Sequence, residues 1–252
     1  MNFLKPLKHK EGYLFLLFLL LLWCFISSRK DWGSVYLFPS LRQIGNAFLK
    51  NGRLFKDTLS SLALLTPTFL TAAFLGISLG ILTGGIPLLH RLFKPFSRLA
   101  SPIPPNIYIP YAIALLPTFR LAAGFVIFVA AFWPVFLNTA TGAMVLPKQY
   151  KDNAATLGIK GVELLWRITL VAALPHIFAG LAVGLGLSFI MLTVAELVGT
   201  NEGLGYFIQY KADYSEYDGM VAGIIYTGLL VFVIMELLEL LRRRLLFWTG
   251  TK

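Results

Sequence analysis

Long apolar runs are the feature that most restricts how this chain can fold. A helix needs about 20 mostly apolar residues to cross the hydrocarbon core of a bilayer. On that basis the sequence predicts six spans, at residues 12–28, 59–82, 103–116, 121–144, 177–199 and 220–241. Charged residues make up only 13% of the chain, about half of their usual share in soluble proteins. We therefore expect an all-α, polytopic membrane protein with a single transmembrane domain over residues 1–252.

The first run has an alternative interpretation as a cleaved signal peptide, because it follows Lys5, Lys8 and Lys10. Signal peptides end in small residues in an Ala-x-Ala pattern. Here the run ends in two serines followed by Arg29 and Lys30, and it is longer than a typical signal core. An uncleaved first span is therefore the better prediction.

Positive charge predicts the orientation of the spans. The chain has 22 Lys and Arg against 12 Asp and Glu, and Lys and Arg favour the cytoplasmic side of a membrane. Six spans with both termini in the cytoplasm place most of these residues there. The basic segment 29–56 is an exception, and we expect it to form a helix on the outer surface. This distribution explains the net charge of +10 without a nucleic-acid partner.

Small residues recur at every fourth position in three of the predicted spans. Such residues let helix backbones approach closely in lipid. Packing within one bundle explains the ladders, and a seam between two copies of the chain is the alternative. The three ladders are Gly76, Gly80 and Gly84; Gly180, Gly184 and Ser188; and Gly219, Gly223 and Thr227.

Two features mark candidate pathway residues. The third run is broken by prolines, and irregular backbone at membrane depth is tolerated where it lines a cavity. Pro105 and Pro110 are therefore candidates, although tight turns are the alternative. Glu196 is acidic within an apolar run, and intramembrane charges tend to face the bundle or a water-filled cavity. We expect it to gate the outer end of a pathway, or else to be an interfacial carboxylate capped by the nearby loop.

A polar stretch at 146–175 lies between the fourth and fifth predicted spans. Residues 152–157 are predicted to form a short helix that Gly158 ends, as glycine often does. Residues 162–170 are predicted to form a second short helix. Together they would make a helix–glycine–helix elbow that a soluble partner could grip.

This stretch resembles the cytoplasmic loop of binding-protein-dependent ABC importer permeases, with the pattern Glu-Ala-Ala, three residues, Gly, nine residues, Ile, one residue, Leu-Pro. Asp152, Asn153 and Ala154 stand at the Glu-Ala-Ala positions, and Gly158 at the glycine. Ile168 and Leu170 follow at the expected spacing, whereas Val171 replaces the proline. Residues 193–208 and 132–139, which include Asn138, are similar to the sulfonate, taurine, nitrate and bicarbonate branch. The resemblance covers about residues 58–241.

The resemblance implies a type I ABC importer permease fold and a division of labour. The coupling helix would include Asp152, Asn153, Ala154, Ala155, Leu157, Gly158 and Gly161, while Pro105, Pro110, Asn138 and Glu196 are pathway or gate candidates. The implied partners are a second copy of the chain, two cytoplasmic ATPase subunits that bind ATP and Mg, and an extracytoplasmic solute-binding protein. The location would be the bacterial inner membrane.

No catalytic function is expected of the chain itself. It lacks the sequence Gly-x-x-x-x-Gly-Lys-Ser/Thr that cradles phosphates, so no ATP-binding site is expected. No Cys or carboxylate groups with His9 or His90 at metal-ligand spacing, so no metal is expected, and no other cofactor is expected either. The alternative function is a secondary transporter that works without an ATPase. Such transporters are typically built from internal repeats, and no convincing repeat relates spans 1–3 to spans 4–6. Apart from Arg120, at an outer turn, no cationic residue lies well within a predicted span. This pattern weakly disfavours a tight anion site within the membrane.

Overall fold

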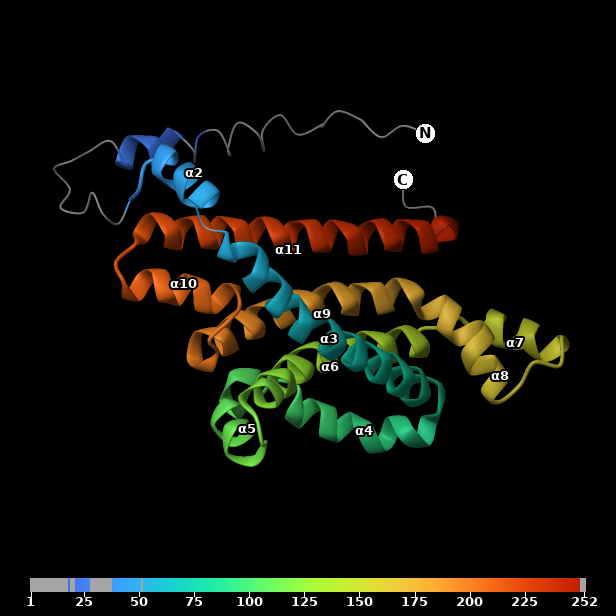
Figure 1. The fold of residues 1–252 in the computed structure, drawn as a ribbon. Coiled ribbons are helices and arrows are strands. Elements are labelled where there is room, and N and C mark those ends of the chain that lie inside the picture. The colour runs from blue at the N-terminus through green and yellow to red at the C-terminus, as the bar shows by residue number, and fades with distance from the viewer. Residues whose placement is uncertain (1–17, 19–20, 28–37, 51, 250–252) are drawn as a thin grey trace.

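The computed structural model describes residues 18, 21–27, 38–50 and 52–249, and its arrangement is shown in Figure 1. Regular structure in these ranges is helical, and no strand forms in them. Of the first predicted span, 12–28, residue 18 and residues 21–27 are described and helical, and the others lie outside the described residues.

Within the described ranges, four long helices are apolar enough to cross a membrane, and they confirm four of the predicted spans. A bilayer core of about 30 Å requires helices of about this length. They are α3 (Arg53–Gly85), α6 (Phe119–Met144), α9 (Leu170–Gly199) and α11 (Tyr217–Leu245).

The predicted third span, 103–116, is wrong as one continuous helix. The structure divides it into a 3₁₀ turn, η1 (Pro105–Tyr108), and a short helix, α5 (Ile109–Leu115). Seven helical residues extend only about 10 Å, so α5 alone cannot cross a bilayer. The chain instead returns along the bundle in two pieces, first α4 (Pro87–Ala100) and then η1 and α5 (Figure 1). The prolines explain the break, because each removes a backbone donor.

Helix α6 forms the centre of the bundle, with α3 and α9 packed closely against it. A Cβ built at Gly80 of α3 would lie 2.6 Å from the Cβ of Thr139 and 3.0 Å from the Phe136 carbonyl oxygen. A Cβ at Gly180 of α9 would lie 2.9 Å from the Pro134 carbonyl oxygen. Two of the predicted ladders therefore bring their helices onto α6 within one chain.

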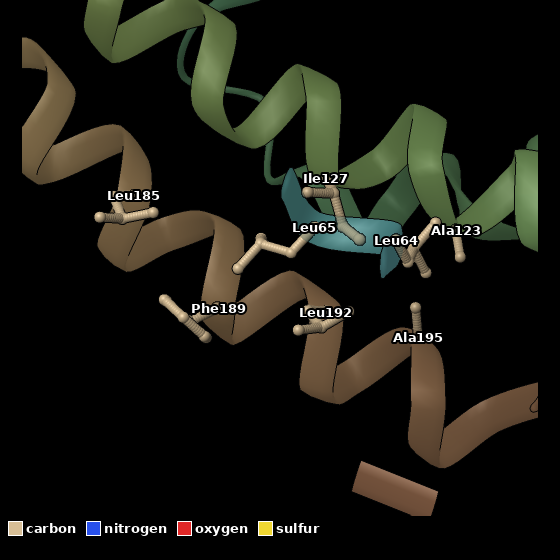
Figure 2. Packing of buried hydrophobic residues seen from close by; sticks show 8 residues of the cluster. All are labelled: Leu64, Leu65, Ala123, Ile127, Leu185, Phe189, Leu192 and Ala195. Carbon is tan, nitrogen blue, oxygen red and sulfur yellow. The ribbon is translucent and has the colours of Figure 1, made fainter. Parts of the chain in front are cut away.

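An apolar cluster fills the space between these three helices (Figure 2). Its side chains are almost fully buried, and burying one large aliphatic side chain stabilises a protein in water by about 1.5–3 kcal/mol. In lipid the gain comes instead from close packing. The members are Leu64 and Leu65 from α3, Ala123 and Ile127 from α6, and Leu185, Phe189, Leu192 and Ala195 from α9.

The third ladder lies on α11 and faces α10 (Leu204–Asp213). A Cβ at Gly223 would lie 2.9 Å from a ring carbon of Phe207, and one at Gly219 would lie 3.0 Å from the Lys211 side chain. All three ladders thus serve packing within one chain.

Part of the basic segment 29–56 forms helix α2 (Leu41–Lys50). The predicted helix is therefore present, and its location on the outer surface stays a prediction. Its buried residues Ile44 and Ala47 pack with Val221 and Ala222 of α11. The helix therefore lies across the start of α11 (Figure 1).

We expect Gly80→Ala to lower the free energy of unfolding by about 1–3 kcal/mol, because overpacked interiors cost about that much. Gly228→Ala is the matched control, since a Cβ there meets nothing within 4 Å and alanine favours the helix by about 0.5–1 kcal/mol. Unfolding in mixed detergent micelles would measure both variants. Equal stability of the two would contradict the close approach of α3 to α6.

Candidate functional sites at the two ends of the bundle

The first candidate site is an elbow at one end of the bundle, formed by α7 (Lys148–Thr156), a turn, and α8 (Val162–Leu164) (Figure 1). We call residues 148–164 the coupling elbow. Gly158 and Gly161 have φ values of +77° and +60°, a region that side chains disfavour. The amide of Ile159 donates to the Ala154 carbonyl at 2.9 Å and closes the end of α7.

The elbow presents its side chains outward. Of the seven residues predicted to contact an ATPase only Ala154 is buried, and the other six are exposed. Leu157 is 77% exposed and Val162 is 69% exposed. Lys151 and Lys160 lie beside these exposed apolar side chains. Exposed apolar groups bordered by polar residues are typical of protein–protein contact surfaces.

Two details of the predicted elbow are wrong. Helix α7 begins at Lys148, four residues before the predicted start at Asp152, so Asp152 lies in its second turn. The predicted second short helix, 162–170, is instead the start of one helix that runs from Val162 to Gly199. No proline or glycine interrupts residues 162–174, so nothing local ends that helix. A π-helical turn at Leu165–Thr169 lies within it.

The second candidate site is a buried polar cluster at the opposite end, where α10 begins. Glu196 of α9 is 3% exposed. One carboxylate oxygen accepts a hydrogen bond from Ser61 Oγ at 2.6 Å, and the other accepts one from the Gly205 amide at 2.7 Å. Both oxygens of this buried side chain therefore have a hydrogen-bond partner, as buried polar groups ordinarily do.

Asp57 and Ser61 of α3 complete this polar cluster. Asp57 Oδ1 accepts from the Gly203 amide at 3.2 Å, and its Oδ2 lies 3.3 Å from Arg53 Nε. Ser61 Oγ accepts from the Leu204 amide at 3.0 Å. Three successive amides at the start of α10 are therefore satisfied by side chains of α3 and α9, where a helix ordinarily uses a cap from its own sequence.

These contacts match the capped-carboxylate interpretation of Glu196. Because Glu196 also lines a small cavity of about 150 Å³ together with Arg120 and Glu202, its predicted gating role stays a prediction. Sequence reasoning missed Asp57 and Ser61. The one local signal was that the residue before α10 is Gly203, which has no side chain to cap the helix.

Glu202 forms an ion pair beside this cluster, with Lys56 Nζ 2.8 Å from its carboxylate. The hydrogen bond from Lys56 lowers the pKa of Glu202, and the charges of Lys56, Arg53 and Arg120 act in the same direction. The pair links the loop before α10 to α3 and is exposed to solvent, so its contribution to stability is small.

A larger cavity of about 600 Å³ lies between α3, α6 and the connection from α5 to α6. Thr118 and Arg120 are among its polar residues, and Arg120 also lines the 150 Å³ cavity. We call the larger one the Arg120 cavity. Neither of these two cavities is lined by the other predicted pathway residues, Pro105, Pro110 and Asn138.

Local structure accounts for Pro110 and Asn138. Pro110 lies in the first turn of α5, where a helix has no use for the missing amide. Asn138 Nδ2 donates to the Pro134 carbonyl at 2.8 Å within α6. Their pathway roles stay predictions. Among the described residues, no three His, Cys, Asp or Glu side chains gather as a metal site would require.

Comparison with known proteins agrees with this architecture. Residues 53–247 match the family model described as "Binding-protein-dependent transport system inner membrane component". The chain belongs to this family. It is therefore a permease subunit of an ABC importer and has the type I permease fold.

Several curated relatives fall in the predicted branch. The nitrate import permease protein NrtB of Synechocystis sp. is 33% identical over 188 residues, 73% of this chain and 68% of the relative. The bicarbonate transport system permease protein CmpB of Synechococcus elongatus is 33% identical over 194 residues, 77% and 70% of the two chains. The taurine transport system permease protein TauC of Escherichia coli is 29% identical over 197 residues, 78% and 72%.

We expect Ser61→Ala to lower the free energy of unfolding by about 1–3 kcal/mol, because it leaves a buried carboxylate oxygen and a buried amide without their shared partner. Ser60→Ala, one residue earlier on α3, is the matched control, since no hydrogen bond of the Ser60 hydroxyl is found among the described residues. Thermal unfolding of the two purified variants in the same detergent would measure the difference. Indistinguishable melting curves would show that the polar cluster does not anchor α10.

Proposed function

We propose that the chain works as a homodimer in which each coupling elbow docks on a cytoplasmic ATPase subunit. The ATPase binds ATP and Mg and hydrolyses the nucleotide, while the two permease chains form the pathway between them. An extracytoplasmic solute-binding protein delivers the substrate. The observation that carries this proposal is the exposure of the elbow, because the apolar side chains at its tip, Leu157 and Val162, lie at the surface and not in the core.

The chemistry of the elbow supports a protein partner. Leu157 and Val162 are exposed apolar residues on either side of two glycines in positive-φ conformations. Ion pairing of Arg167 with Glu163 at 2.9 Å supports the first turns of the long helix behind them. Interfaces are most stable where exposed apolar groups enter a complementary groove. The elbow is thus a firm apolar projection on the end of a long helix.

Charge supports an orientation with the elbow in the cytoplasm. Lys148, Lys151 and Lys160 of the elbow lie at the same end of the bundle as the basic last turn of α11, residues 242–244 (Figure 1). Basic residues accumulate on the cytoplasmic side of membrane proteins. The C-terminus is then cytoplasmic, and the polar cluster and the Arg120 cavity face the outside of the bacterial inner membrane. An even number of spans would place the N-terminus in the cytoplasm as well.

The substrate class comes from the relatives. Their names refer to nitrate, bicarbonate and taurine, which are small solutes that share an anionic oxygen-bearing group. We infer that this importer carries a small oxyanion of the same kind.

Leu157→Asp and Gly158→Val should each abolish co-purification of the ATPase while leaving the permease folded. The first places a charge on the apolar tip, and the second places a β-branched residue where φ is +77°, a conformation that such residues avoid. Tyr214→Asp, which changes a residue of 65% exposure at the opposite end, is the control and should retain the ATPase. The readouts are subunit masses and ATP hydrolysis of the complex purified with its neighbouring gene products.

Retention of the ATPase by both elbow variants would place the docking surface elsewhere. Purification of the wild-type permease without any nucleotide-hydrolysing partner would favour transport without an ATPase.

A further inference from the structure

Arg120 is the cationic residue in the walls of both cavities at the end opposite the elbow. It is the second residue of α6 and is exposed. Among the described residues, no carboxylate lies within 4 Å of its guanidinium, although six other ion pairs form. Its charge is therefore not matched by a contact within the chain.

The charged neighbours of Arg120 already have partners of their own. Arg53 pairs with Asp57, Lys56 pairs with Glu202, and the Glu196 carboxylate accepts from Ser61 and Gly205. Glu202 does feel the charge of Arg120 at longer range, but its close contact is with Lys56. The cavity wall thus keeps one cation that is free to bind an anion.

Helix stability does not explain a cation at this position. Positive charge in the first turn of a helix opposes the helix dipole, which favours anions there. An arginine at the second position of α6 is therefore placed where it costs stability, and it offsets none of that cost with an ion pair. A role outside the folding of the chain accounts better for it.

Thr118 supplies a second donor beside Arg120. Its Oγ1 accepts a hydrogen bond from the Leu121 amide at 3.3 Å. This bond does not use the hydroxyl hydrogen, which can therefore be donated to a ligand. The hydroxyls of Thr68 and Thr71, also in the cavity wall, donate to the Leu64 and Pro67 carbonyls at 2.7 Å. The donors available to a ligand are therefore concentrated at Thr118 and Arg120.

We propose that the Arg120 cavity is a transit site for a small oxyanion, held by the Arg120 guanidinium and the Thr118 hydroxyl. This inference rests on the proposed function and adds the residues that receive the substrate at the outer mouth of the permease. A guanidinium binds two oxygens of a planar or tetrahedral oxyanion at once, which suits nitrate, bicarbonate and sulfonate groups alike. The rest of the lining is largely apolar, including Leu116, Phe125 and Phe128, so binding would be weak enough for release.

The test measures the electrostatic potential inside the cavity on the full-length chain. Cys24, the single cysteine, is replaced by serine, and Thr71→Cys places a reporter thiol in the cavity wall. Modification rates are then compared for the anionic sulfonatoethyl and the cationic trimethylammonioethyl methanethiosulfonate reagents. We expect Arg120→Gln to lower the anionic-to-cationic rate ratio by about tenfold, because one nearby charge acts oppositely on the two reagents.

Two matched variants make the result specific. Arg120→Lys should keep most of the ratio, because it retains the charge, and it also gives a reading if Arg120→Gln fails to fold. Arg42→Gln removes an exposed arginine of α2 that lines neither cavity, and it should leave the ratio unchanged. A ratio that is the same in the Arg120→Gln and Arg42→Gln chains would overturn the proposal.

Protection of the reporter thiol identifies the source of the anion. Nitrate, bicarbonate or taurine, added in a phosphate-free maltoside detergent, should slow modification in the chain with Arg120 and not in the Arg120→Gln chain, and choline should have no effect. Protection that appears only in phosphatidylglycerol vesicles would assign the site to a lipid phosphate and overturn the transit role. The measurement needs no ATPase, so a failure of the proposed function would be seen separately, as absence of a co-purifying ATPase.

Discussion

The close approach of α3 and α9 to the backbone of α6 is the interaction on which the rest of this structure depends. In lipid there is no hydrophobic drive between helices, so contact between backbones and between small residues must hold them together. Gly80 and Gly180 allow that contact on the two sides of α6. The three helices therefore form a tightly packed unit. The two candidate functional sites, the coupling elbow and the polar cluster, lie at the two ends of that unit.

Much of this unit could be predicted because its signals are local. A span is recognised from about 20 consecutive residues, and a small-residue ladder from residues four apart. The four helices α3, α6, α9 and α11 and the ladders on α3, α9 and α11 were therefore predictable. The elbow was predictable for the same reason, because Gly158 breaks a short polar helix. The prolines of the third run indicated irregular backbone, but they did not show that the path divides into two pieces, α4 and α5.

The polar cluster could not be predicted in the same way. Glu196 was conspicuous as a charge within an apolar run, but its partner Ser61 is 135 residues away in the sequence. Asp57 lies 146 residues from the amide that it caps. Nothing near Asp57 or Ser61 in the sequence distinguishes a buried cap from an ordinary polar residue at a helix end. Their role follows only from the packing of α3 against α9, which brings them to the start of α10.

Helix geometry connects the two ends. The helix from Val162 to Gly199 is continuous, and at 1.5 Å per residue it extends about 57 Å from the elbow to the polar cluster. The π-helical turn at Leu165–Thr169 is its least regular part, and such turns often occur where a helix adapts to function. Beyond that turn the helix is fixed to α6 by its glycines and to α3 by Glu196 and Ser61.

This fixation restricts how the proposed importer can open and close. A pull on the elbow cannot slide α9 past α6, because the Cβ-free faces at Gly180 and Gly184 have no room for a shifted register. Close-packed interiors have discrete arrangements and do not deform continuously. We therefore expect force applied at the elbow to move α3, α6 and α9 as one body, together with the Arg120 cavity. In the homodimer that we propose, alternating access would then come from rotation of the two bodies against each other, with the cavity of each body turned toward or away from the shared pathway.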